Sequence, residues 1–158
     1  MSAVTIYIVR HAKAGKRSEW HDDDSLRPLS KTGWKQAELI AAQLKKHSIT
    51  SLISSPATRC VQTLEPLADL TKLKVKVDKR LIEFGDVADM LAIAEEVEDS
   101  TVLSSHGDMI PELIKTLERR GMKIESKPDW RKGSVWVVER TNKGFKSATA
   151  WPPPQVED

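Results

Sequence analysis

The sequence predicts an α/β fold, built as a single three-layer α/β/α domain over residues 1–158 with a mainly parallel sheet and a late β-hairpin. The first observation is that short runs rich in β-branched residues alternate with helical patterns, which is typical of βαβ units. The second is a pair of late strand-like runs around Asn142-Lys143-Gly144, a sequence that favours a hairpin turn. A chain of 158 residues can bury about two-thirds of its unfolded surface in one such domain.

The first strand and the first helix are expected near the N-terminus. An apolar run from Val4 to Val9 predicts a buried strand, and a polar, glycine-containing loop then extends to Pro28. Ser30 is a good N-cap for a helix from about Lys31 to His47. Apolar residues at three- and four-residue spacing predict the buried face of this helix: Trp34, Ala37, Ala41 and Leu44.

A second strand over Ser51 to Ser54 is followed by a second helix. We expect this helix to open at Ser55-Pro56, because a proline at the first helical position lacks only an N–H that has no helical partner. Val75 and Val77 alternate with lysines, which indicates a third strand with one wetter face or an edge position. The apolar face of the second helix is expected at Val61, Leu64, Leu67 and Ala68.

The next part of the chain repeats the alternation of helix and strand. A helix from about Val87 to Val97 leads into a fourth strand over Thr101 to Ser105. The segment Asp108 to Arg120 then reads as a helix that Gly121 closes as its C-cap.

The C-terminal part is expected to end in a hairpin and a tail. The hairpin strands are predicted over Ser134 to Arg140 and Phe145 to Ala150. Residues 151–158 form an extended tail that is stiffened by three prolines, with Trp151 packed against the domain.

Composition excludes several classes of protein. With 39% hydrophobic and 30% charged residues, the chain is typical of a globular protein rather than a disordered one. A net charge of +2 gives no concentrated basic stripe of the kind that nucleic-acid binding needs, so we expect no nucleic-acid partner. The single Cys60 cannot form an internal disulfide and fits a reducing compartment. No apolar run reaches the length of a membrane span and no secretory signal is recognisable, so we expect a cytoplasmic protein without a membrane partner.

Three predicted strands end on residues that suit an anion. Arg10-His11 follows the first strand, Ser55 follows the second and leads to Arg59, and His106 follows the fourth. In an open α/β sheet, ligands bind beyond the carboxyl ends of the strands. Arginine offers a fixed fork of donors to phosphate oxygens, and a neutral imidazole can attack phosphorus. A strand end that is polar by chance is the alternative for Arg10-His11 taken alone, but convergence of all three ends predicts a phosphoryl site.

At these positions the chain resembles the histidine phosphatase superfamily, also called phosphoglycerate-mutase-like. Three runs carry the resemblance, in the order typical of the family: Val9-Arg10-His11-Ala12, Ser54 to Thr63, and Ser105-His106-Gly107. The lack of a large insertion is similar to the short branch that includes the SixA-type phosphohistidine phosphatases. The resemblance is closer still to the phosphatase domain fused behind a nudix hydrolase in some bacterial MutT-like proteins, although no nudix portion is present here. Three runs carry it: Arg10 to Gly15, Arg27-Pro28-Leu29 and Arg59 to Thr63.

The resemblance implies a role for each of these residues. His11 would be the nucleophile that becomes phosphorylated, Arg10 and Arg59 would clamp the phosphoryl oxygens, and His106 would stabilise their charge. Many members of the family use a glutamate after the third strand as the proton donor, and Glu83 matches that place. A solvated loop carboxylate is the alternative for Glu83. Asp108 is a rival proton donor that could equally be a helix N-cap.

The loop after the first strand departs from the family pattern. Ala12 stands where glycine is more common, and the loop carries Lys13, Lys16 and Arg17 where many members have an asparagine that touches phosphate. The extra cations favour a substrate with more than one negative charge, or else form a solvated basic loop. We expect three residues to bind substrate: Lys13, Arg17 and Ser55. His21 beside the aspartates 22–24 could suggest a metal, but a run of charges is usually a solvated face, so neither a metal nor a cofactor is expected.

The resulting expectation is a metal-independent phosphohydrolase that acts through a phosphohistidine on His11. An open cleft favours an exposed phosphoryl group on a phosphohistidine protein or on a nucleotide over a small sugar phosphate. A mutase is disfavoured, because little of the sequence could close over an intermediate. Two alternatives stay open: a non-catalytic phosphate- or phosphoprotein-binding module of the same fold, and a metal-dependent hydrolase that a chelator would inactivate.

Overall fold

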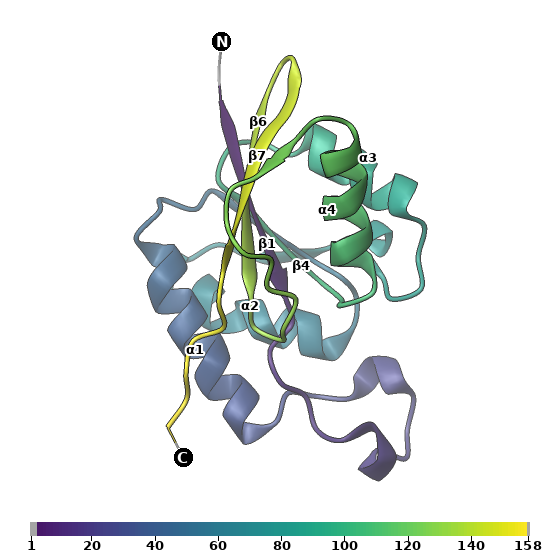
Figure 1. Ribbon diagram of the computed structural model, residues 1–158. Coiled ribbons are helices and arrows are strands. Elements are labelled where there is room, and N and C mark those ends of the chain that lie inside the picture. Colours follow the sequence, from purple (N-terminus) through teal and green to yellow (C-terminus); the bar gives the residue numbers. More distant parts are fainter. Residues whose placement is uncertain (1–2, 158) are drawn as a thin grey trace.

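The computed structural model describes residues 3–157 and contains a seven-stranded sheet with helices on both faces (Figure 1). The strands are β1 (Val4–Arg10), β2 (Ser51–Ser54), β3 (Val75–Val77), β4 (Thr101–Ser105), β5 (Lys123–Ile124), β6 (Val135–Thr141) and β7 (Gly144–Trp151). The helices are α1 (Lys31–Lys45), α2 (Thr58–Thr71), α3 (Val87–Glu96) and α4 (Met109–Arg119), with short 3-10 turns η1 (Arg17–Glu19), η2 (Asp24–Leu26) and η3 (Lys79–Leu81).

The strand order, β3-β2-β4-β1-β6-β7-β5, confirms the predicted α/β architecture. β3, β2, β4 and β1 are mutually parallel, so their carboxyl ends lie at one edge of the sheet. β6 runs antiparallel to both β1 and β7, which confirms the late hairpin. β3 lies at one end of the sheet, as its alternation of valine with lysine indicates. The two-residue strand β5, which pairs with β7, carries too few residues for a sequence pattern to predict it.

The central strand β1 is buried on both faces and divides the core into two layers. Tyr7 and Val9 pack with α1 and α2, whereas Ile6 and Ile8 pack with α3 and α4. Figure 1 shows the sheet nearly edge-on with these helices on its two sides. Each fully buried aliphatic side chain contributes about 1.5–3 kcal/mol to folding. Burial on both faces explains why β1 reads as a continuous apolar run rather than an alternating one.

Local hydrogen bonds fix most helix ends where the sequence predicts them. The Gly33 N–H donates to Ser30 Oγ at 3.1 Å, so Ser30 caps α1 as predicted. At the far end of α4, the Gly121 and Met122 N–H groups donate back to Glu118 and Leu117, and Gly121 adopts a φ of 106°. This left-handed residue ends the helix at the predicted glycine.

The start of α2 differs from the prediction. We expected the helix to open at Ser55-Pro56, but it begins at Thr58, with Ala57 as its N-cap residue. The Ser55 hydroxyl accepts a hydrogen bond from the Ala57 N–H at 3.3 Å and also contacts His106. These contacts hold Ser55 and Pro56 in a turn between β2 and α2. Arg59 nevertheless lies in the first turn of the helix, as predicted.

The C-terminal tail runs beside α1 (Figure 1). Trp151, which ends β7, is half-buried, and its ring centroid lies 5.9 Å from that of Tyr7 and 5.3 Å from that of His47. Trp151 is therefore packed, as predicted, and His47 serves as part of this aromatic contact. Over residues 3–157, the helices are too short or too polar to cross a membrane.

Candidate active site

A cleft of about 460 Å³ opens at the carboxyl ends of β1 and β4. The strand register places Arg10, at the end of β1, opposite Ser105, at the end of β4, so the residues that follow the two strands are neighbours. His11 and His106 both line the cleft, and their ring centroids lie 5.6 Å apart. Two histidines that are 95 positions apart in the chain therefore meet in one site because their strands are paired and parallel.

His11 is almost fully buried and held in one orientation. Its Nδ1 lies 2.8 Å from the carbonyl oxygen of Ala12. A carbonyl can only accept, so the proton is on Nδ1 and the lone pair of the ring is on Nε2. Burial, opposed by the Ala12 carbonyl and reinforced by the nearby cations, lowers the pKa of His11 to about 3. At neutral pH His11 is thus a neutral imidazole with a free Nε2, which is the form of a nucleophile.

His106 is oriented by a serine behind it. Its Nε2 lies 2.8 Å from Ser55 Oγ, and that oxygen already accepts from the Ala57 N–H. The other ring nitrogen, Nδ1, lies 3.4 Å from Glu83 Oε2, and a carboxylate can only accept, so the ring proton of His106 is on Nδ1. The Ser55 hydroxyl then donates to Nε2. Burial first, and then the Arg59 charge, lower the pKa of His106 to about 4, so it offers one N–H in the free protein.

Arg59 is buried and paired with carboxylates. Its Nη2 lies 2.5 Å from Glu83 Oε2 and 3.3 Å from Asp24 Oδ2, while Nη1 donates to the Asp24 carbonyl at 2.9 Å. Arg59 lines a second, smaller hollow of about 220 Å³ rather than the main cleft. Glu83 and His106 line both hollows and form the boundary between them. In the free protein the Glu83 carboxylate thus holds the guanidinium that we expected to meet phosphate.

Arg10 enters the cleft from the end of β1 and is fixed by its surroundings. Its Nη1 donates to the Trp130 carbonyl at 2.5 Å. A Cβ at Gly107 would come within 2.4 Å of the Arg10 guanidinium carbon, so only glycine leaves this space. Partial burial lowers the pKa of Arg10, opposed by the Asp108 carboxylate. Gly107 therefore leaves the space that the Arg10 guanidinium occupies.

The remaining predicted residues are divided between the cleft and its walls. Lys13 and Arg17 line the cleft, and Arg17 Nη2 lies 3.5 Å from Glu83 Oε1. Ser55 lies behind His106 and lines only the smaller hollow. Asp108 also lines the cleft, but its Oδ2 accepts from the Phe84 N–H at 2.8 Å and its side chain makes no N-cap bond to α4. Asp108 thus ties down the loop that carries Glu83.

Sequence reasoning missed two cations of the cleft, Arg27 and Lys132. Arg27 is buried, and its Nη1 donates to the Gly15 carbonyl at 2.6 Å while Nε contacts Asp24 at 2.9 Å. The aspartate run that could have suggested a metal therefore supplies a partner for arginines instead. Across the described residues, no group of three or more His, Cys, Asp or Glu side chains is arranged to hold a metal. The Arg27-Pro28-Leu29 segment was a signal for Arg27, whereas nothing in the sequence around Lys132 marks it.

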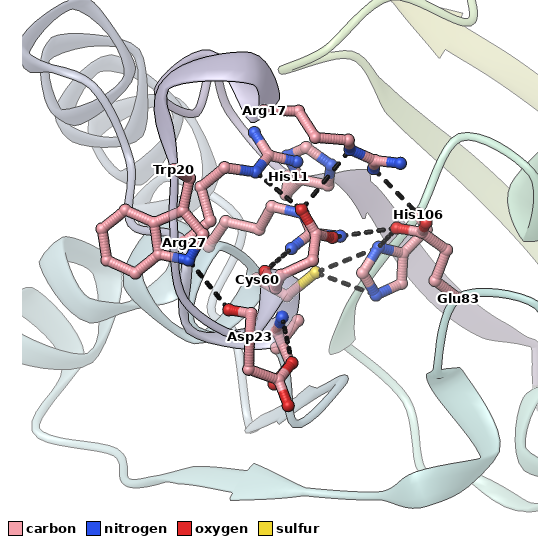
Figure 2. A network of polar contacts seen from close by, with 12 residues as sticks. His11, Arg17, Trp20, Asp23, Arg27, Cys60, Glu83 and His106 are labelled. Atoms are coloured by element: carbon pink, nitrogen blue, oxygen red, sulfur yellow. Dashed lines mark hydrogen bonds and ion pairs between the residues drawn. The ribbon is translucent and has the colours of Figure 1, made fainter.

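Cys60 is a further buried neighbour of the site that the sequence did not assign to it. Its Sγ lies 3.5 Å from His106 Nε2, and Figure 2 shows it on the opposite side of the ring from Glu83. Burial raises the pKa of the Cys60 thiol to about 12. At neutral pH it is a neutral thiol that packs against His106 and is not a nucleophile.

This arrangement suits transfer of a phosphoryl group. A neutral histidine with a free Nε2 faces a second histidine that offers an N–H, and cationic side chains surround both. Glu83 places a carboxyl group at the boundary of the cleft, beside His106. Preorganised donors and cations stabilise the charge that develops on phosphoryl oxygens.

Comparison with known proteins places this site in a family context. The model of the histidine phosphatase superfamily (branch 1) matches residues 6–102. An 8-oxo-(d)GTP phosphatase of Mycolicibacterium smegmatis is 34% identical over 157 residues, which covers 95% of this chain and 48% of that protein. The chain thus spans about half the length of this relative.

Solved structures resemble the fold over nearly its whole length. The SixA protein of Nakamurella multipartitia matches with a TM-score of 0.78 at 24% identity, covering 98% of this chain and 99% of that chain. The protein histidine phosphatase SixA in complex with tungstate matches with a TM-score of 0.73 at 27% identity, covering 94% of each chain.

Proposed function

The chain belongs to the histidine phosphatase superfamily, branch 1, and on that premise we propose that it is a metal-independent phosphohydrolase that works through a phosphohistidine on His11. The observation that carries the proposal is the state of His11. It is buried and neutral, its Nδ1 proton is engaged by the Ala12 carbonyl, and its Nε2 is free. A structural histidine gains nothing from being held in this form among cations, whereas a nucleophile needs it.

In the first step, the His11 Nε2 lone pair forms a bond to phosphorus as the bond from phosphorus to the leaving atom breaks. Arg10 and the His106 N–H stabilise the negative charge on the phosphoryl oxygens. Arg59 joins them after exchanging its contact with Glu83 for the phosphoryl group. Both contacts are charge-assisted, so the exchange replaces one strong hydrogen bond with another.

Glu83 is the proposed proton donor to the leaving group. It contacts Arg59, Arg17 and His106 at the boundary of the cleft, so it can reach a group bound there. In its protonated form this carboxyl group can give a proton to the leaving atom. In the second step the resulting carboxylate accepts a proton from water as that water attacks phosphorus, the bond from Nε2 to phosphorus breaks, and phosphate leaves.

Two kinds of substrate fit the proposal: a nucleotide and a phosphohistidine on another protein. The name of the Mycolicibacterium relative supports the first, and the likeness to SixA, a protein histidine phosphatase, supports the second. Tungstate, which is bound in the second SixA structure, is a tetrahedral oxyanion like phosphate. An open cleft is compatible with either, because both present the phosphoryl group at the end of a larger molecule.

The test is release of inorganic phosphate from nucleotides and from phosphoramidate, with and without EDTA. The proposal predicts that EDTA leaves the rate unchanged and that His11→Asn lowers it by more than about a thousandfold, because removing a nucleophile abolishes the covalent route. Loss of activity in EDTA, or a His11→Asn variant with more than a tenth of the wild-type rate, would contradict the proposal.

A further inference from the structure

A groove of about 490 Å³ adjoins the cleft, and its charge is one-sided. The cleft and this groove share three lining residues, Arg10, Lys13 and Lys132, which therefore lie where the two meet. The C-terminal tail supplies the opposite wall through Pro153, Pro154 and Gln155. None of the lining residues of the groove, within the part of the chain that the structure describes, carries a carboxylate. The groove therefore suits a negatively charged ligand that extends out of the cleft.

The loop that carries Lys132 is fixed to the end of β1. The Gly133 N–H donates to the carbonyl oxygens of Arg10 at 3.1 Å and His11 at 3.2 Å. Gly133 has a φ of 85°, a conformation that favours glycine. The Trp130 carbonyl, two residues before Lys132, accepts from Arg10 Nη1. The position of the Lys132 backbone is thus set by the same strand end that presents His11.

The cations around Lys132 differ in whether a carboxylate pairs with them. Arg131 pairs with Asp129 at 2.6 Å, whereas over residues 3–157 neither Lys13 nor Lys132 takes part in an ion pair. Partial burial, followed by the charges of nearby arginines and Lys13, lowers the pKa of Lys132. These cations repel one another in the free protein, which is unfavourable. An anion bound between them replaces the repulsion with attraction.

We propose that Lys132, together with Lys13, binds a second phosphoryl group joined to the one that His11 takes, which makes the substrate a phosphoanhydride. The inference rests on the proposed function, since it places the transferred group at His11. The bond from Nε2 to phosphorus forms as the P–O bond of the bridge breaks, and the electron pair stays on the bridging oxygen of the second phosphoryl group. Lys132 offsets the negative charge of the second phosphoryl group, while Glu83 remains the proton donor to this oxygen. A phosphohistidine, whose phosphoryl group stands alone, makes no use of this contact.

The test compares two probes that cannot be hydrolysed, methylenediphosphonate and methylphosphonate, by calorimetric titration. We expect wild-type protein to bind the diphosphonate at least tenfold more tightly. Lys132→Met should reduce that preference about tenfold, because a charge-assisted contact is lost. Lys132→Arg should keep most of the preference. Lys146→Met replaces an exposed lysine of β7 that lines neither the cleft nor the groove, and it should leave both affinities unchanged.

Two results would overturn the inference. One is a wild-type protein that binds the two probes with equal affinity. The other is a Lys132→Met variant whose affinity falls by the same factor for both probes. The second result would mean that the substitution only disturbs the site. Because the titration needs no turnover, it separates the two proposals. Diphosphonate binding that depends on Lys132, in a protein that releases no phosphate, would count against the phosphohydrolase alone.

Discussion

At the scale of single residues, the site depends on which atom of each ring carries the proton. The Ala12 carbonyl fixes the proton of His11 on Nδ1, and the Glu83 carboxylate places that of His106 on the same atom of its ring. The two histidines therefore have different tasks although burial lowers both pKa values. One presents a lone pair, and the other presents an N–H. Neither assignment can be read from sequence, because each depends on an oxygen that the fold brings to the ring.

Glu83→Gln tests the proton donor at this scale. The substitution keeps the shape of the side chain and removes the proton that it gives. We expect the rate on an alkyl phosphate, which has a poor leaving group, to fall about a hundredfold or more, and the rate on para-nitrophenyl phosphate to fall much less. The leaving-group dependence of kcat is the readout, because a disturbed Arg59 contact alone would slow both substrates equally. Glu98→Gln, an exposed glutamate before β4, is the matched control. An equal loss on both substrates would exclude Glu83 as the donor.

At the scale of elements, three parts of the site meet at the turn between β4 and α4. His106, Gly107 and Asp108 follow one another, and each meets a different part of the site. His106 faces the cleft, Gly107 leaves room for Arg10, and Asp108 anchors the Phe84 N–H. A single three-residue turn therefore fixes the relative positions of the first motif and the Glu83 loop.

Gly107→Ala should separate this geometry from overall stability. The added methyl group would come within 2.4 Å of the Arg10 guanidinium carbon, so the end of that side chain must move. We expect kcat/KM to fall about 10- to 100-fold, in line with loss of one hydrogen bond to a charged group, while the thermal midpoint changes little. Gly15→Ala, whose methyl group meets no atom within 4 Å, should lose much less. Wild-type kcat/KM in Gly107→Ala would show that the position of Arg10 is not critical.

The elements were largely predictable because their signals are local. The β1 run, the Ser30 cap and the Asn142-Lys143-Gly144 turn each specify structure within a few residues. The start of α2 was mispredicted because the Ser55 hydroxyl is used by the Ala57 N–H and by His106, a contact across 51 positions. The strand ends predicted the meeting of Arg10, His11 and His106. The engagement of Arg59 with Glu83, and the place of Lys132, depend on loops without a recognisable pattern.

At the scale of the whole molecule, the sheet gathers charge that is dispersed along the chain. The cations of the cleft come from the end of β1, the loop after it and the loop before β6. The net charge of +2 gives no hint of this concentration, because acidic residues compensate it elsewhere. Parallel strand order is what turns dispersed residues into one site. The cleft is open, so a substrate can present its phosphoryl group while the rest of it stays outside.

The covalent intermediate on His11 is the central claim, and trapping it is the most direct measurement. Protein mixed with a phosphoryl donor, quenched within one turnover and mapped by mass spectrometry should carry a phosphoryl group on His11 that is labile in acid and stable in base. His11→Asn should carry none, and His21→Asn, which replaces an exposed histidine outside the cleft, should be labelled like wild type. Turnover without any label on His11, or label on another residue, would contradict the account.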